Sequence, residues 1–164
     1  MQMLFSKRLP TLITVLATLG LLSACTASDD QADVASDIDS TMDTLVSAAW
    51  LREHLDDPDL VVIDATVLVE QDGSGNMLSV NGRPSYEAGH IPGAVFADFM
   101  GDLSDADSEL EFAVPSPEQC AAAMGALGVG DDARVVLYDT NSMSWAARVL
   151  WMLRWIGFDR AALL

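Results

Sequence analysis

The sequence predicts an α/β protein built on an open parallel sheet with helices on both faces. Two nearly continuous apolar runs, Leu60–Ala65 and Arg134–Tyr138, have the length and composition of strands that are buried on both faces. Segments with helix caps separate these runs, and a third apolar run follows at Ala161–Leu164. Such alternation of strands and helices is typical of parallel sheets with right-handed crossovers.

The N-terminal segment has the features of an export signal. Lys7 and Arg8 form a basic region, and Leu9–Leu22 is an apolar stretch shorter than the roughly 20 residues of a membrane-spanning helix. The residues LSAC, ending at Cys25, resemble the lipobox of bacterial lipoproteins. The resemblance implies cleavage after Ala24 and a membrane anchor on the Cys25 thiol, because each buried CH₂ of an acyl chain contributes about 0.8 kcal/mol. The alternative is an ordinary signal peptide that leaves Cys25 as a free thiol.

Residues 25–44 predict an acidic, disordered linker between the signal peptide (1–24) and a folded domain (45–164). The linker has too few large apolar residues to offset the entropy lost on ordering. Thr26, rather than Asp, follows the cysteine, which under the usual lipoprotein sorting rule favours the periplasmic side of the outer membrane. The chain has 25 acidic and 8 basic residues and a formal charge of −17. This charge argues against nucleic acid as a partner, and solubility or a salty habitat explains it most simply.

The folded domain is predicted to begin with an edge strand and a helix. Leu45-Val46 has the composition of a short edge strand, and Ser47 is a suitable N-cap for a helix over Ala48–Leu55. His54 lies on this helix one turn beyond Trp50. A surface or packing role is favoured for this histidine over a catalytic one.

Asp64 stands near the end of the first buried strand, where ligand clefts form in open α/β sheets. We favour a structural role for Asp64, in which it bonds loop amides or Arg83. The next segment, Val67–Asn81, contains Gly73 and Gly75 and predicts a loop or a hairpin.

The segment Gly82–Asp98 predicts a helical turn, a tight turn and a strand. Ser85–Ala88 can form one helical turn, and Gly89 is expected to end it in the left-handed conformation. The pair Pro92-Gly93 predicts a chain reversal, because proline fixes φ and glycine allows a positive φ. The apolar run Ala94–Ala97 has the length of a strand.

The residues GRPSYEAGHIPGA at 82–94 resemble the GR-x-x-Y-x-x-GHIPGA signature of rhodanese-like sulfurtransferases. The segments VSAAWLREHLDDPDLVVIDA, PSPEQCAAAMGALGVGDDARVVLYD and WAARVLWMLRWIGFD resemble the N-terminal half of two-domain thiosulfate or 3-mercaptopyruvate sulfurtransferases. The resemblance implies a rhodanese-like sheet and transfer of sulfane sulfur from thiosulfate or 3-mercaptopyruvate to a thiol or cyanide. It implies no cofactor and no metal, and the two cysteines, Cys25 and Cys120, form neither a disulfide framework nor a metal site.

The second half of the domain continues the alternation of helices and strands. Phe99–Val114 is acidic and irregular, and Ser116 is an N-cap for a helix that runs from Pro117 to Leu127. Cys120 lies inside this helix among small apolar residues, where a thiol packs as a small hydrophobe and no thiolate is stabilised. A further helix is predicted over Trp145–Ile156.

The resemblance places the nucleophile position of catalytic rhodanese domains at Asp139, directly after the strand Arg134–Tyr138. Catalysis needs a cysteine there, because backbone N–H groups and the following helix stabilise its thiolate and the persulfide that it becomes. The loop Asp139–Ser144 has neither cysteine nor glycine, and a carboxylate cannot carry sulfane sulfur. Phosphatases related to this family hold their nucleophile in the same loop. The absence of a cysteine there therefore argues against phosphatase activity as well.

The resemblance to a two-domain enzyme implies that the partner of this domain is a catalytic C-terminal rhodanese domain, absent from this chain, which acts on a small sulfur-containing substrate. Arg83, His90 and Asp98 are then candidates for a cleft or domain interface, while the structural alternative has Arg83 and His90 bond Asp64 and backbone carbonyls. The chain stops inside an expected strand, so we expect a C-terminally incomplete domain from a fragment. The other function left open is a catalytically inactive rhodanese-like module for binding or regulation, anchored in the cell envelope.

Overall fold

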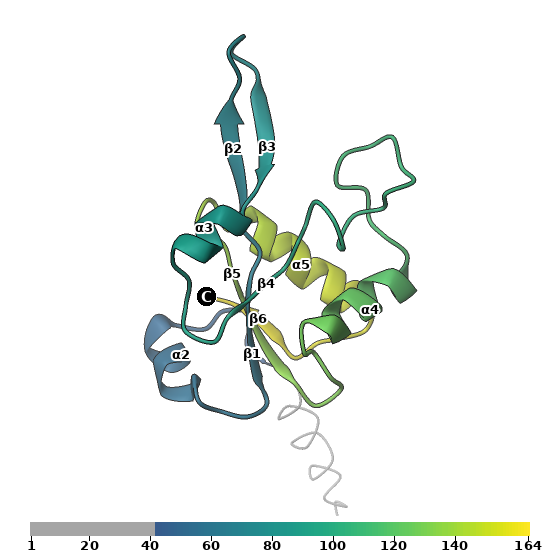
Figure 1. The fold of residues 1–164 in the computed structure, drawn as a ribbon. Coiled ribbons are helices and arrows are strands. Elements are labelled where there is room, and N and C mark those ends of the chain that lie inside the picture. The colour runs from purple at the N-terminus through teal and green to yellow at the C-terminus, as the bar shows by residue number, and fades with distance from the viewer. Residues whose placement is uncertain (1–41) are drawn as a thin grey trace, which may run out of the picture. The chain divides into compact units, whose positions relative to one another are not determined.

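The computed structural model describes residues 42–164 and confirms the predicted α/β architecture (Figure 1). The central sheet has four parallel strands in the order β4-β1-β5-β6. These strands are β1 (Leu60–Asp64), β4 (Val95–Phe96), β5 (Arg134–Tyr138) and β6 (Ala161–Leu163). Because all four strands run in one direction, the residues that follow β1, β4 and β5 gather at one edge of the sheet.

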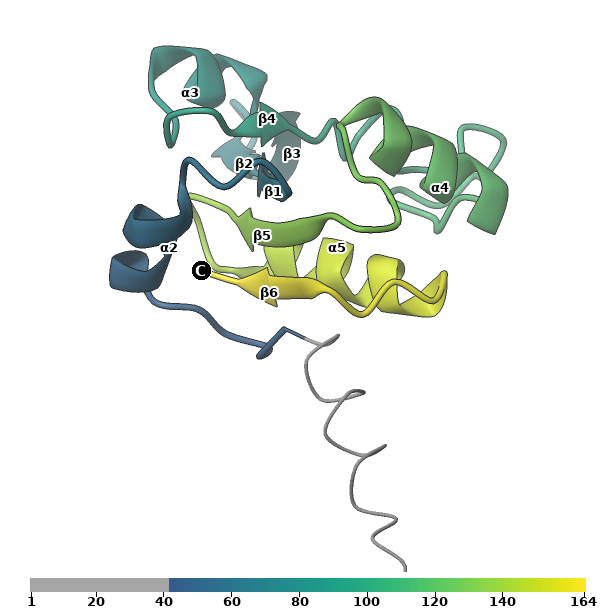
Figure 2. The ribbon, with the colours of Figure 1, turned by 90° about the horizontal axis from the view of Figure 1, so that it is seen from below.

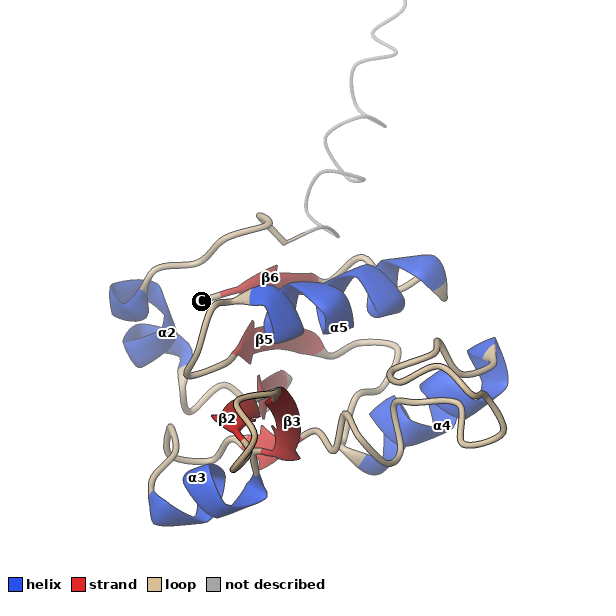
Figure 3. Cartoon of the chain, turned by 90° about the horizontal axis from the view of Figure 1, so that it is seen from above, coloured by secondary structure: helices blue, strands red, loops and turns tan. Residues whose placement is uncertain are grey.

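Helices lie on both faces of the sheet, as predicted (Figures 2 and 3). One face packs against α4 (Pro117–Ala126) and α5 (Ser144–Trp155) in a core that contains Ile63, Val135 and Leu137. The other face packs against α2 (Ala48–His54). The alternate strand residues form this second core with the helix; they are Val62, Val136 and Tyr138 from the strands and Leu51 from α2. The strands are therefore apolar on both sides, which explains their unbroken hydrophobic runs.

The outer edge of the sheet is completed by residues from the start of the described chain. Leu45 forms a parallel bridge with Leu163, and the Val46 amide donates to the Leu163 carbonyl at 2.8 Å. The expected edge strand at Leu45-Val46 is thus present as an isolated bridge. Ser47 caps α2 as predicted, since its side chain accepts a hydrogen bond from the Trp50 amide.

The segment between β1 and the signature forms a hairpin of β2 (Val67–Gln71) and β3 (Met77–Asn81), which is one of the two predicted alternatives. Figure 1 shows this hairpin extending away from the central sheet, with which it shares no strand pairing. The exposed apolar side chains of the hairpin are Val69, Met77 and Leu78. At its tip, Gly75 adopts a φ of 91°, which few other residues tolerate.

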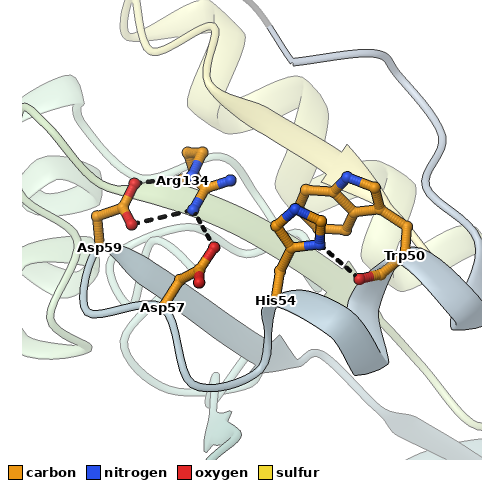
Figure 4. A network of polar contacts seen from close by, with 5 residues as sticks. All are labelled: Trp50, His54, Asp57, Asp59 and Arg134. Atoms are coloured by element: carbon orange, nitrogen blue, oxygen red, sulfur yellow. Dashed lines mark hydrogen bonds and ion pairs between the residues drawn. The ribbon is translucent and has the colours of Figure 1, made fainter.

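A polar network joins α2 to the beginnings of β1 and β5 (Figure 4). The Arg134 guanidinium lies 2.7 Å from carboxylate oxygens of both Asp57 and Asp59, and its hydrogen bond lowers the pKa of Asp59. His54 stacks on Trp50 with ring centroids 4.0 Å apart. His54 therefore has a packing role, which is one of the two roles that the sequence favoured.

The remaining helices begin and end close to their predicted limits. Ser116 caps α4, and Gly128 follows it at a φ of 93°. The helix α5 begins at Ser144, one residue before the predicted start, and Gly157 follows it at a φ of 89°. Among residues 42–164, no helix combines the length and the apolar character that crossing a membrane would require.

Candidate functional site

The loop that joins β5 to α5 is organised by the carboxylate of Asp139. One carboxylate oxygen, Oδ1, accepts hydrogen bonds from the backbone amides of Asn141, Ser142 and Met143 at 2.9 to 3.0 Å. The other, Oδ2, accepts from the amides of Trp145 and Ala146 at 3.1 and 3.0 Å. Five backbone N–H groups thus converge on one side chain.

This convergence has a local cause in the backbone. Met143 adopts a φ of 64°, the left-handed region that methionine rarely enters, and this turns the loop amides inward as α5 begins. The first amides of a helix have no partner within the helix and carry a partial positive charge, so an anion is stabilised there. In this chain the anion is the Asp139 side chain itself. The backbone amides of this loop therefore stabilise a negatively charged group. That group is a carboxylate here, which contains no sulfur atom.

A set of hydrogen bonds connects the Asp139 loop to β1. The Thr140 amide donates to the Thr66 hydroxyl at 3.1 Å, and the Thr66 amide donates to Oδ1 of Asp64 at 2.9 Å. Asp64 is 1% exposed, and its Oδ2 is the buried side-chain oxygen that has no hydrogen-bond partner in the described part of the chain. Tyr138 neighbours Asp64 on β5, and burial, together with the nearby Asp64 carboxylate, raises the pKa of its phenol. Asp64 bonds a loop amide, as the sequence favoured.

The signature segment forms α3 (Arg83–Ala88) and the turn before β4. Helix α3 begins two residues earlier than predicted. Gly89 has a φ of 171°, so the predicted left-handed stop at this residue is wrong. The backbone leaves the helix in an extended direction, which places the His90 ring 3.9 Å from the Tyr86 ring. The chain reverses at Gly93 instead, where φ is 79°, as predicted for the proline–glycine turn.

The structural alternative is wrong for the Arg83–Asp64 bond and is confirmed for His90, which was expected to bond a backbone carbonyl. The Arg83 guanidinium lies 4.7 Å from the centroid of the Phe96 ring, and it forms no ion pair with Asp64, so that expected bond is wrong. The reason is that Asp64 is buried and turned toward its own loop, while the ring of Phe96 offers a closer surface to the guanidinium. His90 does bond a backbone carbonyl, because its Nδ1 lies 2.8 Å from the Tyr86 oxygen.

Asp98 ties the hairpin to the acidic loop. One oxygen of its carboxylate accepts a hydrogen bond from the Asn81 side chain at 2.9 Å and from the Gly101 amide at 3.0 Å. Within residues 42–164, no hydrogen bond or ion pair joins Arg83, His90, Asp98 and Asp139 to one another. Asn81 nevertheless links two of them, because its side-chain oxygen accepts a hydrogen bond from the Arg83 amide at 2.9 Å while its NH₂ group donates to Asp98. The stacked and tilted rings of Phe96, Tyr86 and His90 also lie in series beside the Arg83 guanidinium. Asp139 belongs to a separate network.

The described residues contain one cysteine, Cys120, and its position does not suit a nucleophile. Cys120 is fully buried inside α4, and burial raises the pKa of its thiol, which confirms the packing role. In residues 42–164, no group of three His, Cys, Asp or Glu side chains is placed to hold a metal ion. Cys25 and the predicted signal and linker up to residue 41 lie outside the described residues.

Four residues beside the Asp139 loop were missed by the sequence analysis. Phe99, Phe112, Trp145 and Arg148, together with Ser144, line an open cavity of about 390 Å³. The Trp145 and Arg148 spacing on the helix after the loop was a usable signal, since residues three apart share a helix face. The two phenylalanines come from distant segments, and no local pattern could have joined them to this helix.

Comparisons with known proteins agree on one family. Residues 47–164 match the family described as "Rhodanese-like domain". A 3-mercaptopyruvate sulfurtransferase of Escherichia coli K12 is 41% identical over 119 residues, which are 73% of this chain and 40% of that protein. Human 3-mercaptopyruvate sulfurtransferase is 36% identical over 126 residues, again 73% of this chain and 40% of the relative.

Solved structures give the same result for the fold. A crystal structure of an Escherichia coli 3-mercaptopyruvate sulfotransferase has a TM-score of 0.62 and 39% identity, covering 74% of this chain and 45% of that one. A sulfur transferase subunit of yeast mitochondrial complex I has a TM-score of 0.63 and 26% identity, covering 74% of this chain and 38% of that one. The chain thus spans less than half the length of these relatives.

Proposed function

The chain belongs to the rhodanese-like domain family, and from this premise we propose that it is the non-catalytic N-terminal domain of an exported thiosulfate or 3-mercaptopyruvate sulfurtransferase. Its homologues include 3-mercaptopyruvate sulfurtransferases from bacteria, plants and humans. The substrate would be a small sulfur donor, and the acceptor a thiol or cyanide.

The observation that carries this proposal is the Asp139 carboxylate within the amides of its loop. Sulfur transfer in this family needs a thiolate that takes sulfane sulfur and holds it as a persulfide beside such amides. Asp139 occupies this place with five accepted hydrogen bonds and has no atom that forms a persulfide. Cys120 is no substitute, because it is fully buried and burial raises the pKa of its thiol.

The missing nucleophile is expected in a second rhodanese domain. Alignment with 40% of the length of a 3-mercaptopyruvate sulfurtransferase leaves more than half of that enzyme unmatched. A catalytic domain would then be the partner of this one, and Arg83, His90 and Asp98 are the candidates for the contact between them. Both Arg83 and His90 are exposed in the described chain, which suits such a role.

An assay of two chains tests this proposal. We expect no sulfur transfer by the 164-residue chain with thiosulfate or 3-mercaptopyruvate, and transfer by a longer chain extended with the sequence downstream of Leu164. In the longer chain, replacing the cysteine of the second domain with serine should abolish transfer, while Cys120→Ala should leave it unchanged. Activity of the short chain that is lost on Cys120→Ala would show the assignment of the nucleophile to be wrong.

The proposed location is the periplasmic face of the outer membrane, with the domain anchored through lipid on Cys25. Two or more acyl chains give stable anchoring, whereas a single chain binds a bilayer only marginally. We expect the expressed chain to fractionate with membranes and to incorporate labelled fatty acid, and Cys25→Ser to release it into the soluble fraction. If the unmodified chain and the Cys25→Ser variant divide alike between the membrane and soluble fractions, the N-terminal segment is an ordinary signal peptide.

The second candidate function is a catalytically inactive binding or regulatory module of the envelope. The open cavity beside the Asp139 loop favours this candidate, because a domain without chemistry can still bind a ligand there. Absence of transfer by both the short and the extended chain would leave this module as the function.

A further inference from the structure

Three aromatic rings from three segments surround the open cavity beside α5. Phe99 follows β4, Phe112 belongs to the acidic loop, and Trp145 lies in the first turn of α5. Their ring centroids are 4.8 to 5.7 Å apart, in tilted and edge-on arrangements. Phe99 is 1% exposed and forms the floor, while Phe112 and Trp145 are half-buried and form the walls. We refer to the space lined by Phe99, Phe112, Ser144, Trp145 and Arg148 as the aromatic cavity.

Arg148 is the charged residue at the rim of the aromatic cavity. Its guanidinium donates to the Phe112 carbonyl at 3.3 Å and lies 4.9 Å from the centroid of the Trp151 ring. Within the described part of this acidic chain, Arg148 forms no ion pair, whereas Arg134 pairs with two carboxylates. A guanidinium has five N–H donors in a planar fork, so most of those of Arg148 remain available for a carboxylate.

The backbone is strained at one lining residue of the aromatic cavity, Phe112, and at Met143, which precedes the lining residue Ser144. Phe112 has a φ of 57° and Met143 a φ of 64°, and these are the non-glycine residues with positive φ in the range 42–164. A left-handed conformation is unfavourable for such residues, because Cβ approaches the following carbonyl oxygen. Strain of this kind persists where the surroundings enforce it and is concentrated at binding sites. At Phe112 the strained backbone brings both the ring and the carbonyl toward α5.

We propose that the aromatic cavity binds a small planar aromatic monocarboxylate. Because the three rings pack on one another, the ring of the ligand would lie on their open side, against the half-buried Phe112 and Trp145. Its carboxylate would accept two hydrogen bonds from Arg148. A volume of about 390 Å³ falls in the range of small-ligand sites. The backbone amides of Trp145 and Ala146 are already used by Asp139, so Arg148 is the group that recognises the charge. This site requires no sulfur chemistry and does not depend on the proposed sulfur transfer.

Titration of the 164-residue chain with benzoate, followed by calorimetry and by ¹⁵N–¹H NMR, tests the proposal. We expect the indole N–H resonance of Trp145, assigned with Trp145→Phe, to shift with benzoate. That of Trp50, on α2 across the sheet, should stay in place. Benzamide has the same ring without the charge and should bind at least tenfold more weakly. The same affinity for benzoate and benzamide, or no shift at Trp145, would overturn the proposal.

Substitutions at Arg148 separate recognition of the carboxylate from a general charge effect. Arg148→Gln should weaken benzoate binding at least tenfold, and Arg148→Lys should weaken it less, because lysine keeps the charge without the planar fork. Arg52→Gln on the exposed surface of α2 makes the same change in net charge and should leave the affinity unaltered. Equal effects of Arg148→Gln and Arg52→Gln would show that no specific site exists.

Discussion

Two aspartates in this domain organise loops in the same manner, and their surroundings make them different. At the hairpin tip, Asp72 accepts hydrogen bonds from the amides of Ser74 and Asn76 and from the Asn76 side chain. In the β5–α5 loop, the Asp139 carboxylate accepts hydrogen bonds from five backbone amides. The Asp72 loop closes a turn in solvent, whereas the Asp139 loop lies at the start of a 12-residue helix and at the edge of the parallel sheet.

The difference shows that a carboxylate bonded to loop amides does not by itself mark a functional position. What distinguishes Asp139 is the helix that follows it and the contact of its loop with β1 through Thr66 and Thr140. The hairpin connects the two regions physically, since Thr66 precedes its base and Asp72 lies at its tip. Substitutions at the base should therefore affect the Asp139 loop, and substitutions at the tip should remain local.

The largest effect is expected for Gly82→Ala at the hairpin base. A Cβ at this position would lie 2.0 Å from the Thr66 carbonyl oxygen, which is backbone and cannot move aside without shifting β1 or the hairpin. We expect a loss of roughly 3 kcal/mol or more in the free energy of unfolding, measured by urea denaturation. Chemical shifts of the Thr140 and Asn141 amides should also change, because Thr66 bonds Thr140.

Gly73→Ala at the hairpin tip is the matched control for this substitution. No atom lies within 4 Å of a Cβ at Gly73, so its unfolding midpoint should equal that of the unmodified chain. Equal stability of Gly82→Ala and Gly73→Ala would contradict the close packing of the hairpin base on Thr66.

An intermediate effect is expected for Asp139→Ala. The substitution leaves five loop amides without their acceptor, and the comparable loss of a helix N-cap destabilises proteins by about 2 kcal/mol in strong cases. Asp72→Ala makes the same change in charge but affects an exposed turn, so its unfolding midpoint should shift less. Hydrogen exchange of the Trp145 and Ala146 amides gives a direct readout. If the two variants unfold at the same urea concentration, the distinction between the loops is wrong.

The smallest effect is a pH dependence confined to the hairpin tip. Hydrogen bonds from the side chain and amide of Asn76 lower the pKa of Asp72 below its ordinary value. The ionised form is therefore favoured in the folded hairpin. Its contribution is complete above the ordinary aspartate pKa of about 3.9 and is lost as the pH falls through the lower folded value. Acid titration should shift the Ser74 and Asn76 amide resonances in this range, and Asp72→Asn should abolish the shift.

The sequence predicted those features that depend on residues close together in the chain. The apolar runs of β1 and β5, the Ser47 and Ser116 caps and the Gly128 and Gly157 helix ends all depend on local composition, and the structure confirms them. Asp139 was singled out by the resemblance to rhodanese domains, and its five amide partners were not predicted.

The features that could not be predicted depend on contacts between distant segments. Arg83 was expected on Asp64 but lies over Phe96, because the choice between two partners depends on how deeply each is buried. Gly89 is extended, and His90 stacks on Tyr86 directly after it; the presence of a glycine does not by itself predict which backbone conformation it adopts. The aromatic cavity combines rings that are up to 46 positions apart between Phe99 and Trp145. The spacing of residues along the chain does not predict a tertiary contact of this kind.

The bridge between Leu45 and Leu163 also constrains the order in which the domain can assemble. Residues 44–46 leave the ribosome long before β6 is made, yet their backbone partners are in β6. During synthesis this N-terminal segment therefore has no strand with which to pair, while β1, β4 and β5 can already associate. Completion of the sheet depends on a contact that spans almost the entire domain, and contacts of such long sequence separation form slowly. The unpaired edge should make the nascent chain a client for chaperones until residue 163 has emerged.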